Sequence, residues 1–89
     1  MLVTVHYLAQ MKRAAGCASE AVEIEAGTDL RGLLVHLASC HVGLQPLLLD
    51  EENRPRKSLL FFVGDEHAGP AQLLHDGASV SILAPMAGG

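Results

Sequence analysis

The feature that most constrains the fold is a single amphipathic segment in the middle of the chain. Between residues 30 and 41, apolar positions recur at spacings of three and four, which is typical of one face of an α-helix. These positions are Leu30, Leu33, Leu34, Leu37 and Ala38, with His41 continuing the spacing. Thr28 is the predicted N-cap, with Asp29 behind it near the positive end of the helix dipole. Gly43 is the predicted left-handed C-cap, and Leu44 is expected to fold back onto the helix.

The segments on either side of this helix have the alternation and the composition of β-strands. Residues 2–8 and 21–25 precede the helix and are expected to pair antiparallel. Residues 59–63 and 78–84 follow it and complete the set of predicted strands. Inward-facing side chains are expected at Val3, Val5 and Tyr7 in the first strand and at Val80 and Ile82 in the last. Ser79, Ser81 and Leu83 are expected to face outward.

The connections between these elements are more polar and contain most of the turn residues. Residues 9–19 could hold one helical turn. Residues 46–58 are expected to begin as a short helical or extended piece and to end as an exposed loop that contains Asp50, Glu51 and Glu52. Turns are predicted at residues 64–66 and 75–77, and residues 71–74 could form one short helical turn.

One domain accommodates these elements, because 89 residues with 49% apolar composition provide a single core. We predict an α+β fold in which a mixed sheet packs on one face of the main helix. The first and last strands can lie side by side at the centre of the sheet, which would project the C-terminus from one end. The expected boundaries are a folded domain over residues 1–84 and a flexible C-terminal tail over residues 85–89.

Charge and composition argue against several classes of partner. The net charge is −4, and the six basic residues cluster no further than two adjacent pairs, so nucleic acid is not an expected partner. The first ten residues resemble no signal peptide, and no segment has the roughly 20 apolar residues of a membrane span. We therefore expect a cytoplasmic protein in which Cys17 and Cys40 remain reduced thiols.

Motifs for catalysis or for metal binding are weak. His36 and Cys40 stand four residues apart on the predicted helix, which could in principle place a metal-ligand or Cys-His pair on one face. No third ligand follows at a convincing spacing, so we expect a structural role and no metal site. Nor does the sequence contain paired carboxylates, a phosphate-binding glycine loop or a Ser-His-Asp arrangement.

The order of the elements and three quoted stretches resemble the MoaD/ThiS family of sulfur carrier proteins. "YLAQMKRAAG" is similar to the family's first strand and connection, "GTDLRGLLVHLA" to its helix, and "LLHDGASVSILAPMAGG" to its last turn, last strand and tail. The last stretch is the most specific of the three. This resemblance implies a ubiquitin-like β-grasp fold, with a reactive C-terminal glycine in place of a catalytic pocket.

For the tail, the resemblance implies that an ATP-using, ubiquitin-activating-like adenylyltransferase adenylates Gly89, which then becomes a thiocarboxylate. ATP and Mg²⁺ would belong to that partner, and the chain itself would bind no cofactor and catalyse nothing alone. Gly88 and Gly89 lack Cβ atoms and suit a narrow partner channel. Pro85 lacks an N–H and would release Met86 and Ala87 from the sheet.

We expect docking on an exposed apolar patch formed by Leu8 and Leu83 beside the tail, although both leucines could equally belong to the core. Asp50, Glu51 and Glu52 could meet basic residues of a partner, but a solvated acidic loop is the simpler interpretation. The resemblance favours sulfur transfer to molybdopterin through a molybdopterin synthase large subunit. A carrier for cysteine, thiamine or another sulfur metabolite, a ubiquitin-like protein modifier and a plain β-grasp interaction module remain open.

Overall fold

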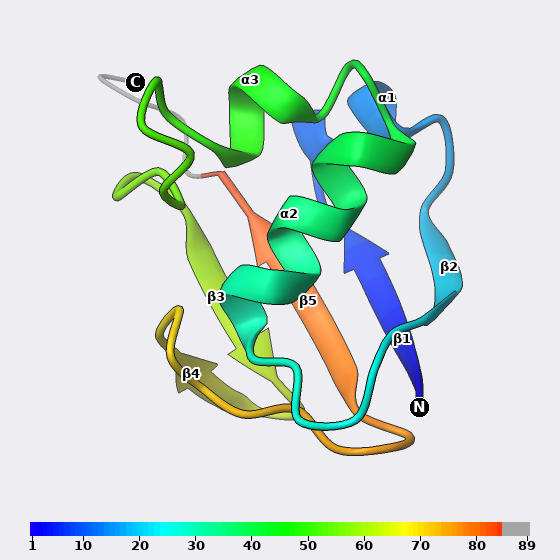
Figure 1. Cartoon of the computed structure of the whole chain (residues 1–89). Helices are drawn as coiled ribbons and strands as arrows, with labels where there is room; N and C mark the ends of the chain where they lie inside the picture. Colours follow the sequence, from blue (N-terminus) through cyan, green and yellow to red (C-terminus); the bar gives the residue numbers. More distant parts are fainter. Residues whose placement is uncertain (85–89) are drawn as a thin grey trace.

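The computed structural model describes residues 1–84, so the predicted tail over residues 85–89 lies outside the described part (Figure 1). Eight elements follow one another along the chain. They are β1 (Leu2–Tyr7), α1 (Gln10–Ala15), β2 (Ser19–Glu23), α2 (Leu30–Cys40), α3 (Gln45–Leu48), β3 (Leu60–Val63), β4 (Glu66–Ala68) and β5 (Ser79–Leu83). Among the described residues, no helix is long and apolar enough to cross a membrane.

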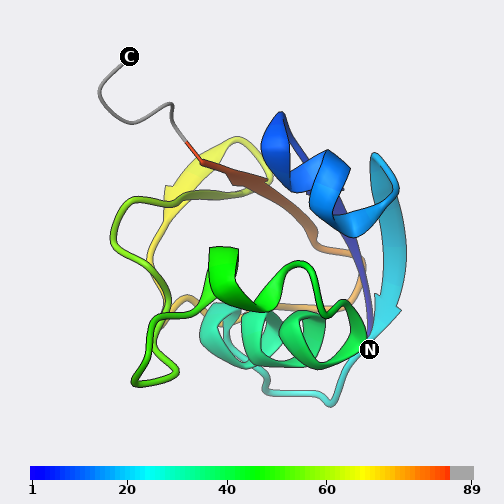
Figure 2. The same ribbon diagram turned by 90° about the horizontal axis from the view of Figure 1, so that it is seen from above.

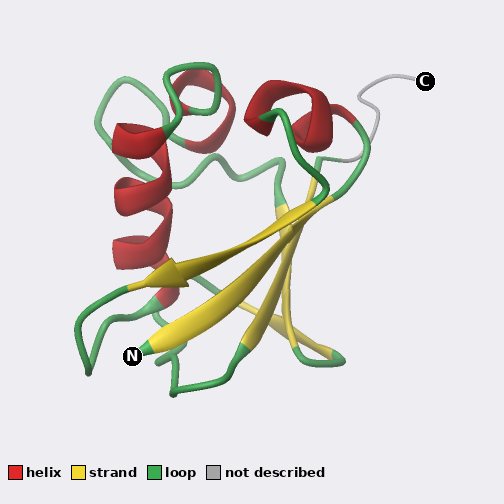
Figure 3. Ribbon diagram, turned by 90° about the vertical axis from the view of Figure 1, so that its right-hand side faces the viewer, coloured by secondary structure: helices red, strands yellow, loops and turns green. Residues whose placement is uncertain are grey.

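The strands form one mixed sheet in the order β2-β1-β5-β3-β4 (Figure 3). The first and last strands lie side by side and parallel, with Thr4 paired to Ser79 and Tyr7 to Ile82, as the sequence predicted. β2 pairs antiparallel with β1, and β3 pairs antiparallel with both β5 and β4. This arrangement, with α2 across one face, confirms the expected β-grasp fold.

The core lies where the sheet curves around α2 (Figure 2). Five strand side chains and four helix side chains are at most 1% exposed, and they are the ones that the two periodicities predicted. They are Val3, Val5 and Tyr7 of β1, Val80 and Ile82 of β5, and Leu30, Leu33, Leu34 and Leu37 of α2. Alternation along β1 and β5 therefore leaves their other side chains on the opposite face of the sheet.

The predicted N-cap of the main helix was wrong by one residue. Asp29 is the N-cap, and its carboxylate Oδ1 accepts a hydrogen bond from the Gly32 N–H at 2.8 Å. Thr28 is engaged elsewhere, because its hydroxyl donates to the Glu25 carbonyl and its own carbonyl accepts from the Leu74 N–H. Pairing with the segment before β5 thus moves the cap from Thr28 to Asp29.

The predicted left-handed C-cap at Gly43 was also wrong. α2 ends at Cys40, its C-cap His41 has an extended φ of −126°, and Gly43 does not have a positive φ. Gly43 instead serves a close approach, since a Cβ atom there would lie 3.1 Å from the Ala14 carbonyl oxygen of the first connection. Leu44 does return to the core, where it is fully buried.

Three further boundaries differ from the prediction. β2 covers residues 19–23 and not 21–25, because its register places Ser19 opposite His6. β4 was missed, since its three residues follow the turn at Gly64 and are too few to show alternation. Residues 71–74 form no helical turn, because Leu73 is held in an extended bridge to Asp29.

Candidate functional site

The candidate site begins at the end of β5, shortly before residues 85–89. Leu83 is the final residue of β5, and Ala84 behind it is buried. The predicted reactive and tail positions lie outside the described residues and are Pro85, Met86, Ala87, Gly88 and Gly89. The describable part of the site is therefore the end of the sheet at which β1 and β5 finish and β3 begins (Figure 1).

Leu8 and Leu83 lie next to each other at this end, on the sheet face opposite α2. The pairing of Tyr7 with Ile82 and the hydrogen bond from the Leu8 N–H to the Ile82 carbonyl, at 3.2 Å, set their positions. Leu83 is in turn paired with Leu60 of β3. We call Leu8, Leu83 and Leu60 the outer apolar row. Leu8 is 42% exposed, whereas Leu83 and Leu60 are half-buried, and none of the three belongs to the core cluster.

An aromatic side chain extends this surface one step further from the tail. Phe62 is paired with Ser81 and is half-buried, and its ring meets that of His67 edge to face at a centroid distance of 5.7 Å. Sequence reasoning missed Leu60 and Phe62. The signal was the unbroken apolar run over residues 59–63, because only alternate side chains of a strand can face the core.

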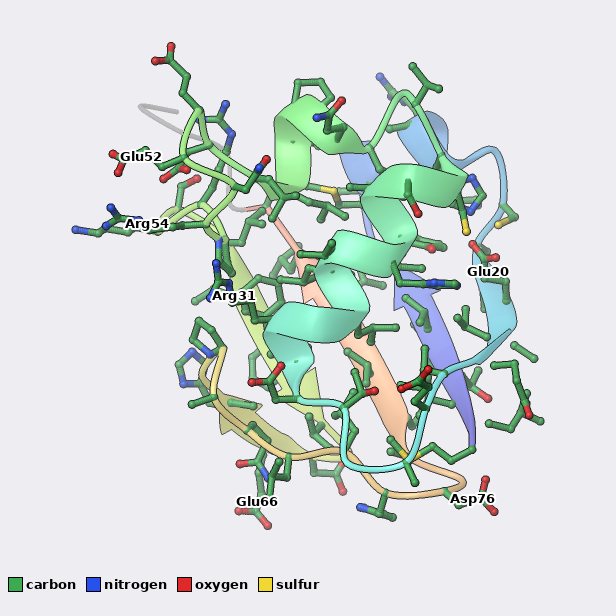
Figure 4. All side chains as sticks on the ribbon, viewed as in Figure 1. Glu20, Arg31, Glu52, Arg54, Glu66 and Asp76 are labelled. Atoms are coloured by element: carbon green, nitrogen blue, oxygen red, sulfur yellow. The ribbon has the colours of Figure 1, made fainter. Side chains whose placement is uncertain are left out.

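Exposed cations flank the outer apolar row. Lys12 and Arg13 lie on α1, just after β1, while Arg56 and Lys57 lie just before β3. The other end of the sheet is acidic and carries Glu66 and Asp76, both exposed (Figure 4). Basic residues therefore follow Leu8 and precede Leu60 closely in the sequence.

The acidic loop uses much of its charge internally. The Asp50 carboxylate accepts hydrogen bonds from the N–H groups of Glu52, at 2.8 Å, and Arg54, at 3.0 Å. These backbone hydrogen bonds, above all that of Arg54, lower the pKa of Asp50. Glu52 forms an ion pair with the Arg54 guanidinium (Figure 4). The loop is exposed and organised by local contacts.

A polar cluster that the sequence did not reveal ties three elements together behind the outer apolar row. The Tyr7 hydroxyl donates to Glu20 Oε2 at 2.7 Å, and His41 Nε2 lies 2.6 Å from the same oxygen. Burial and this hydrogen bond raise the pKa of Tyr7 well above its usual range. One carboxylate thus joins β1, β2 and the end of α2. It fixes the position of Tyr7, the residue just before Leu8.

Each cysteine lies close to one titratable side chain. Cys40 Sγ lies 3.6 Å from His36 Nε2 on α2, and Cys17 Sγ lies 4.0 Å from Glu20 Oε2. Over residues 1–84, no three or more His, Cys, Asp or Glu side chains are grouped as metal ligands. Both thiols are free.

Comparison with known proteins identifies what this arrangement is similar to. The model of the ThiS family matches residues 5–89. Comparison with curated proteins gives no significant match.

Three solved structures illustrate the structural similarity, and the first two show the shared fold alone. A putative molybdopterin converting factor subunit 1 from Pyrococcus furiosus is 22% identical with a TM-score of 0.80, covering 97% of this chain and 99% of the other. The small archaeal modifier protein 1 from Methanosarcina acetivorans is 20% identical with a TM-score of 0.86, covering 99% and 96%. A chain in the BexX/CysO complex of Amycolatopsis orientalis is 25% identical with a TM-score of 0.73, covering 98% and 99%.

Proposed function

Because this chain belongs to the ThiS family, we propose that it is a sulfur carrier of the MoaD/ThiS type and that Gly89 carries the sulfur as a thiocarboxylate. The observation that carries the proposal is the extent of the family match. It runs over residues 5–89 and so includes both the β-grasp body and the Gly-Gly segment. The fold alone would not support it, since one fold serves many functions.

The proposed chemistry starts from a carboxylate. An α-carboxyl group has an unperturbed pKa of about 3.3–3.7 and is ionised at neutral pH, which makes its carbon a poor electrophile. A partner of the ubiquitin-activating type joins the Gly89 carboxylate to the AMP moiety of ATP and releases pyrophosphate. Sulfur at the oxidation level of hydrogen sulfide then attacks the carbonyl carbon, the bond to AMP breaks, and loss of the S–H proton leaves the thiocarboxylate. The chain is a co-substrate in this scheme and supplies no catalytic side chain.

The folded body has a matching role in the proposal. Residues 85–89 reach about 17 Å when extended, which is enough to enter a partner's active site while the sheet stays outside. The outer apolar row is the docking surface, because it lies at the end of β5 and presents apolar side chains that the core does not use. Lys12, Arg13, Arg56 and Lys57 favour a partner with an acidic rim around its apolar contact.

For the sulfur acceptor, we propose molybdopterin synthesis, with the large subunit of molybdopterin synthase as the receiving enzyme. The fold shared with the molybdopterin converting factor subunit is compatible with this destination. The alternative is a carrier for cysteine, thiamine or another sulfur metabolite. The similarity to a chain of the BexX/CysO complex supports this alternative. A protein modifier would use the same adenylate and differ only in its acceptor.

Intact-mass analysis tests the proposal directly. The chain is incubated with its cognate activating enzyme, ATP and a sulfur donor, and replacement of one oxygen by sulfur at Gly89 is expected. A variant that lacks Gly89 should fold normally and gain no sulfur. Lysine adducts on other proteins would indicate a modifier instead, and an unchanged mass in the presence of an active activating enzyme would contradict both. Addition of the molybdopterin synthase large subunit with its pterin precursor then tests the destination.

A further inference from the structure

Among residues 1–84, no strand pairs with the outer edge of β2. β2 forms an outer strand in the order β2-β1-β5-β3-β4, and its five residues include no proline, whereas the other outer strand, β4, has three residues. The hydrogen bonds from Tyr7 N–H to the Ala18 carbonyl and from Ile24 N–H to the Met1 carbonyl set the alternation along β2. By this alternation, Glu20 and Val22 bond to β1, while the N–H and C=O groups of Ser19, Ala21 and Glu23 point away from the sheet.

A groove borders this edge on the side of the helix. Its volume is ≈ 620 Å³, and it is open to solvent. The lining residues are Glu23, Ile24, Glu25, Thr28, Gly32 and His36. Gly32 has no side chain to fill the groove at this part of α2. A Cβ atom there would come within 2.8 Å of Thr28 Cγ2. Glu23 is the residue of β2 that lines the groove, so a strand added beside β2 would reach the groove at this end of the edge.

The charge of the edge selects the occupant. Glu23 and Glu25 are exposed at the groove, the Glu23 side chain to 78%, and no lysine or arginine lines it. The N-terminal amine lies 4.0 Å from Glu23 Oε1, at the limit of an ion pair. A second copy of the chain would bring the same carboxylates and no lysine or arginine to this edge, so it would offer no complementary side-chain charge there. A segment with basic side chains would instead place them near both carboxylates.

We propose that the free edge of β2 binds an extended, lysine- or arginine-bearing segment of a partner protein by β-strand addition. Outward backbone groups at Ser19, Ala21 and Glu23 provide the hydrogen bonds, and the groove beside α2 provides the side-chain contacts. This surface does not include the outer apolar row, so the inference does not rest on the proposed sulfur transfer.

Amide hydrogen exchange of the full chain, followed by NMR, tests the proposal. The probe is a synthetic nonapeptide of alternating lysine and valine, and the matched control peptide alternates glutamate and valine. At peptide concentrations up to about 1 mM, the lysine peptide should slow exchange at the amides of Ser19, Ala21 and Glu23 at least about tenfold. The amides of Glu20 and Val22 are already bonded to β1 and should change little. The glutamate peptide should protect none of them.

Two kinds of variant separate strand addition from loose electrostatic attraction. Ala21→Pro removes one outward N–H without removing a hydrogen bond to β1, and it should abolish the protection, while Ala21→Val should retain it. If Ala21→Pro unfolds the chain, the double variant Glu23→Lys/Glu25→Lys keeps every backbone group and should transfer the preference to the glutamate peptide.

Several results would overturn the proposal. They are a lack of saturable binding, protection that does not alternate along β2, equal binding of both peptides, and protection confined to β3. Slow exchange at the β2 edge that depends on protein concentration and not on peptide would assign the edge to a second copy of this chain instead.

Discussion

The cluster around Glu20 offers the most quantitative test of how this fold is held together. The Tyr7 side chain belongs to a residue that is 1% exposed, and its hydroxyl donates to Glu20 Oε2. Glu20→Ala removes that acceptor and also the partner of His41. The variant removes the acceptor of a buried hydroxyl, and such a loss is one of the larger single costs to stability.

The expected loss follows from the burial. An unpaired buried polar group costs about 1–3 kcal/mol of unfolding free energy. A loss of about 2 kcal/mol would lower Tm by about 8–16 °C in a domain of this size. The matched control is Glu23→Ala on the same strand, whose side chain is 78% exposed and lies 4.0 Å from the N-terminal amine. That surface pair should contribute no more than about 1 kcal/mol.

A double-mutant cycle isolates the hydrogen bond from other effects of the substitution. Tyr7→Phe alone removes the donor and should cost about 0.5–1.5 kcal/mol. In the Glu20→Ala background the same change removes the unpaired hydroxyl, so the double variant should be more stable than Glu20→Ala alone. Denaturant unfolding of the four proteins provides the measurement. The reasoning would be refuted if Glu20→Ala cost no more than Glu23→Ala, or if Tyr7→Phe further destabilised the Glu20→Ala protein.

Three other predictions concern the pH profile, the main helix and the docking surface. The pKa of Tyr7 is raised above its ordinary 10.0, so its stabilisation is present below pH 10 and declines as the pH rises further; Tyr7→Phe should lack that decline in denaturant unfolding. Asp29→Ala should cost about 0.5–2 kcal/mol by loss of the N-cap, and thermal unfolding should show a smaller loss for Thr28→Ala. Leu8→Asp should leave Tm within a few degrees but impair sulfur loading at least about tenfold, with Leu2→Asp as an exposed control on the same strand, at the other end of the sheet; equal loading of both variants would contradict the docking surface.

Much of the fold could be predicted because hydrophobic periodicity is a local property. Spacings of three and four along α2, and alternation along β1 and β5, identified the buried side chains correctly. The caps could not be predicted in the same way. Thr28 and Asp29 are both good N-cap residues, and the choice between them depends on Leu74, which lies far along the chain and bonds to the Thr28 carbonyl.

The candidate site, like the fold, could be predicted from the sequence only in part. The residues of the tail were singled out from the sequence because glycine and proline have distinctive backbone properties. Leu8 and Leu83 were proposed as neighbours from strand order, but Leu60 required the register between β3 and β5. Glu20 and His41 are 21 positions apart, and their contact could not be inferred without the packing of α2 on the sheet.

The sequence by itself determined which faces of the strands and of the helix are apolar, because each side chain's direction follows from the local period. It also determined the chemical character of the last five residues. Only the tertiary structure decided which outward groups meet: the leucines of the outer apolar row, the carboxylate shared by Tyr7 and His41, and the unpaired edge of β2. The physical reason is that these contacts depend on strand order and register, which join residues distant in the chain.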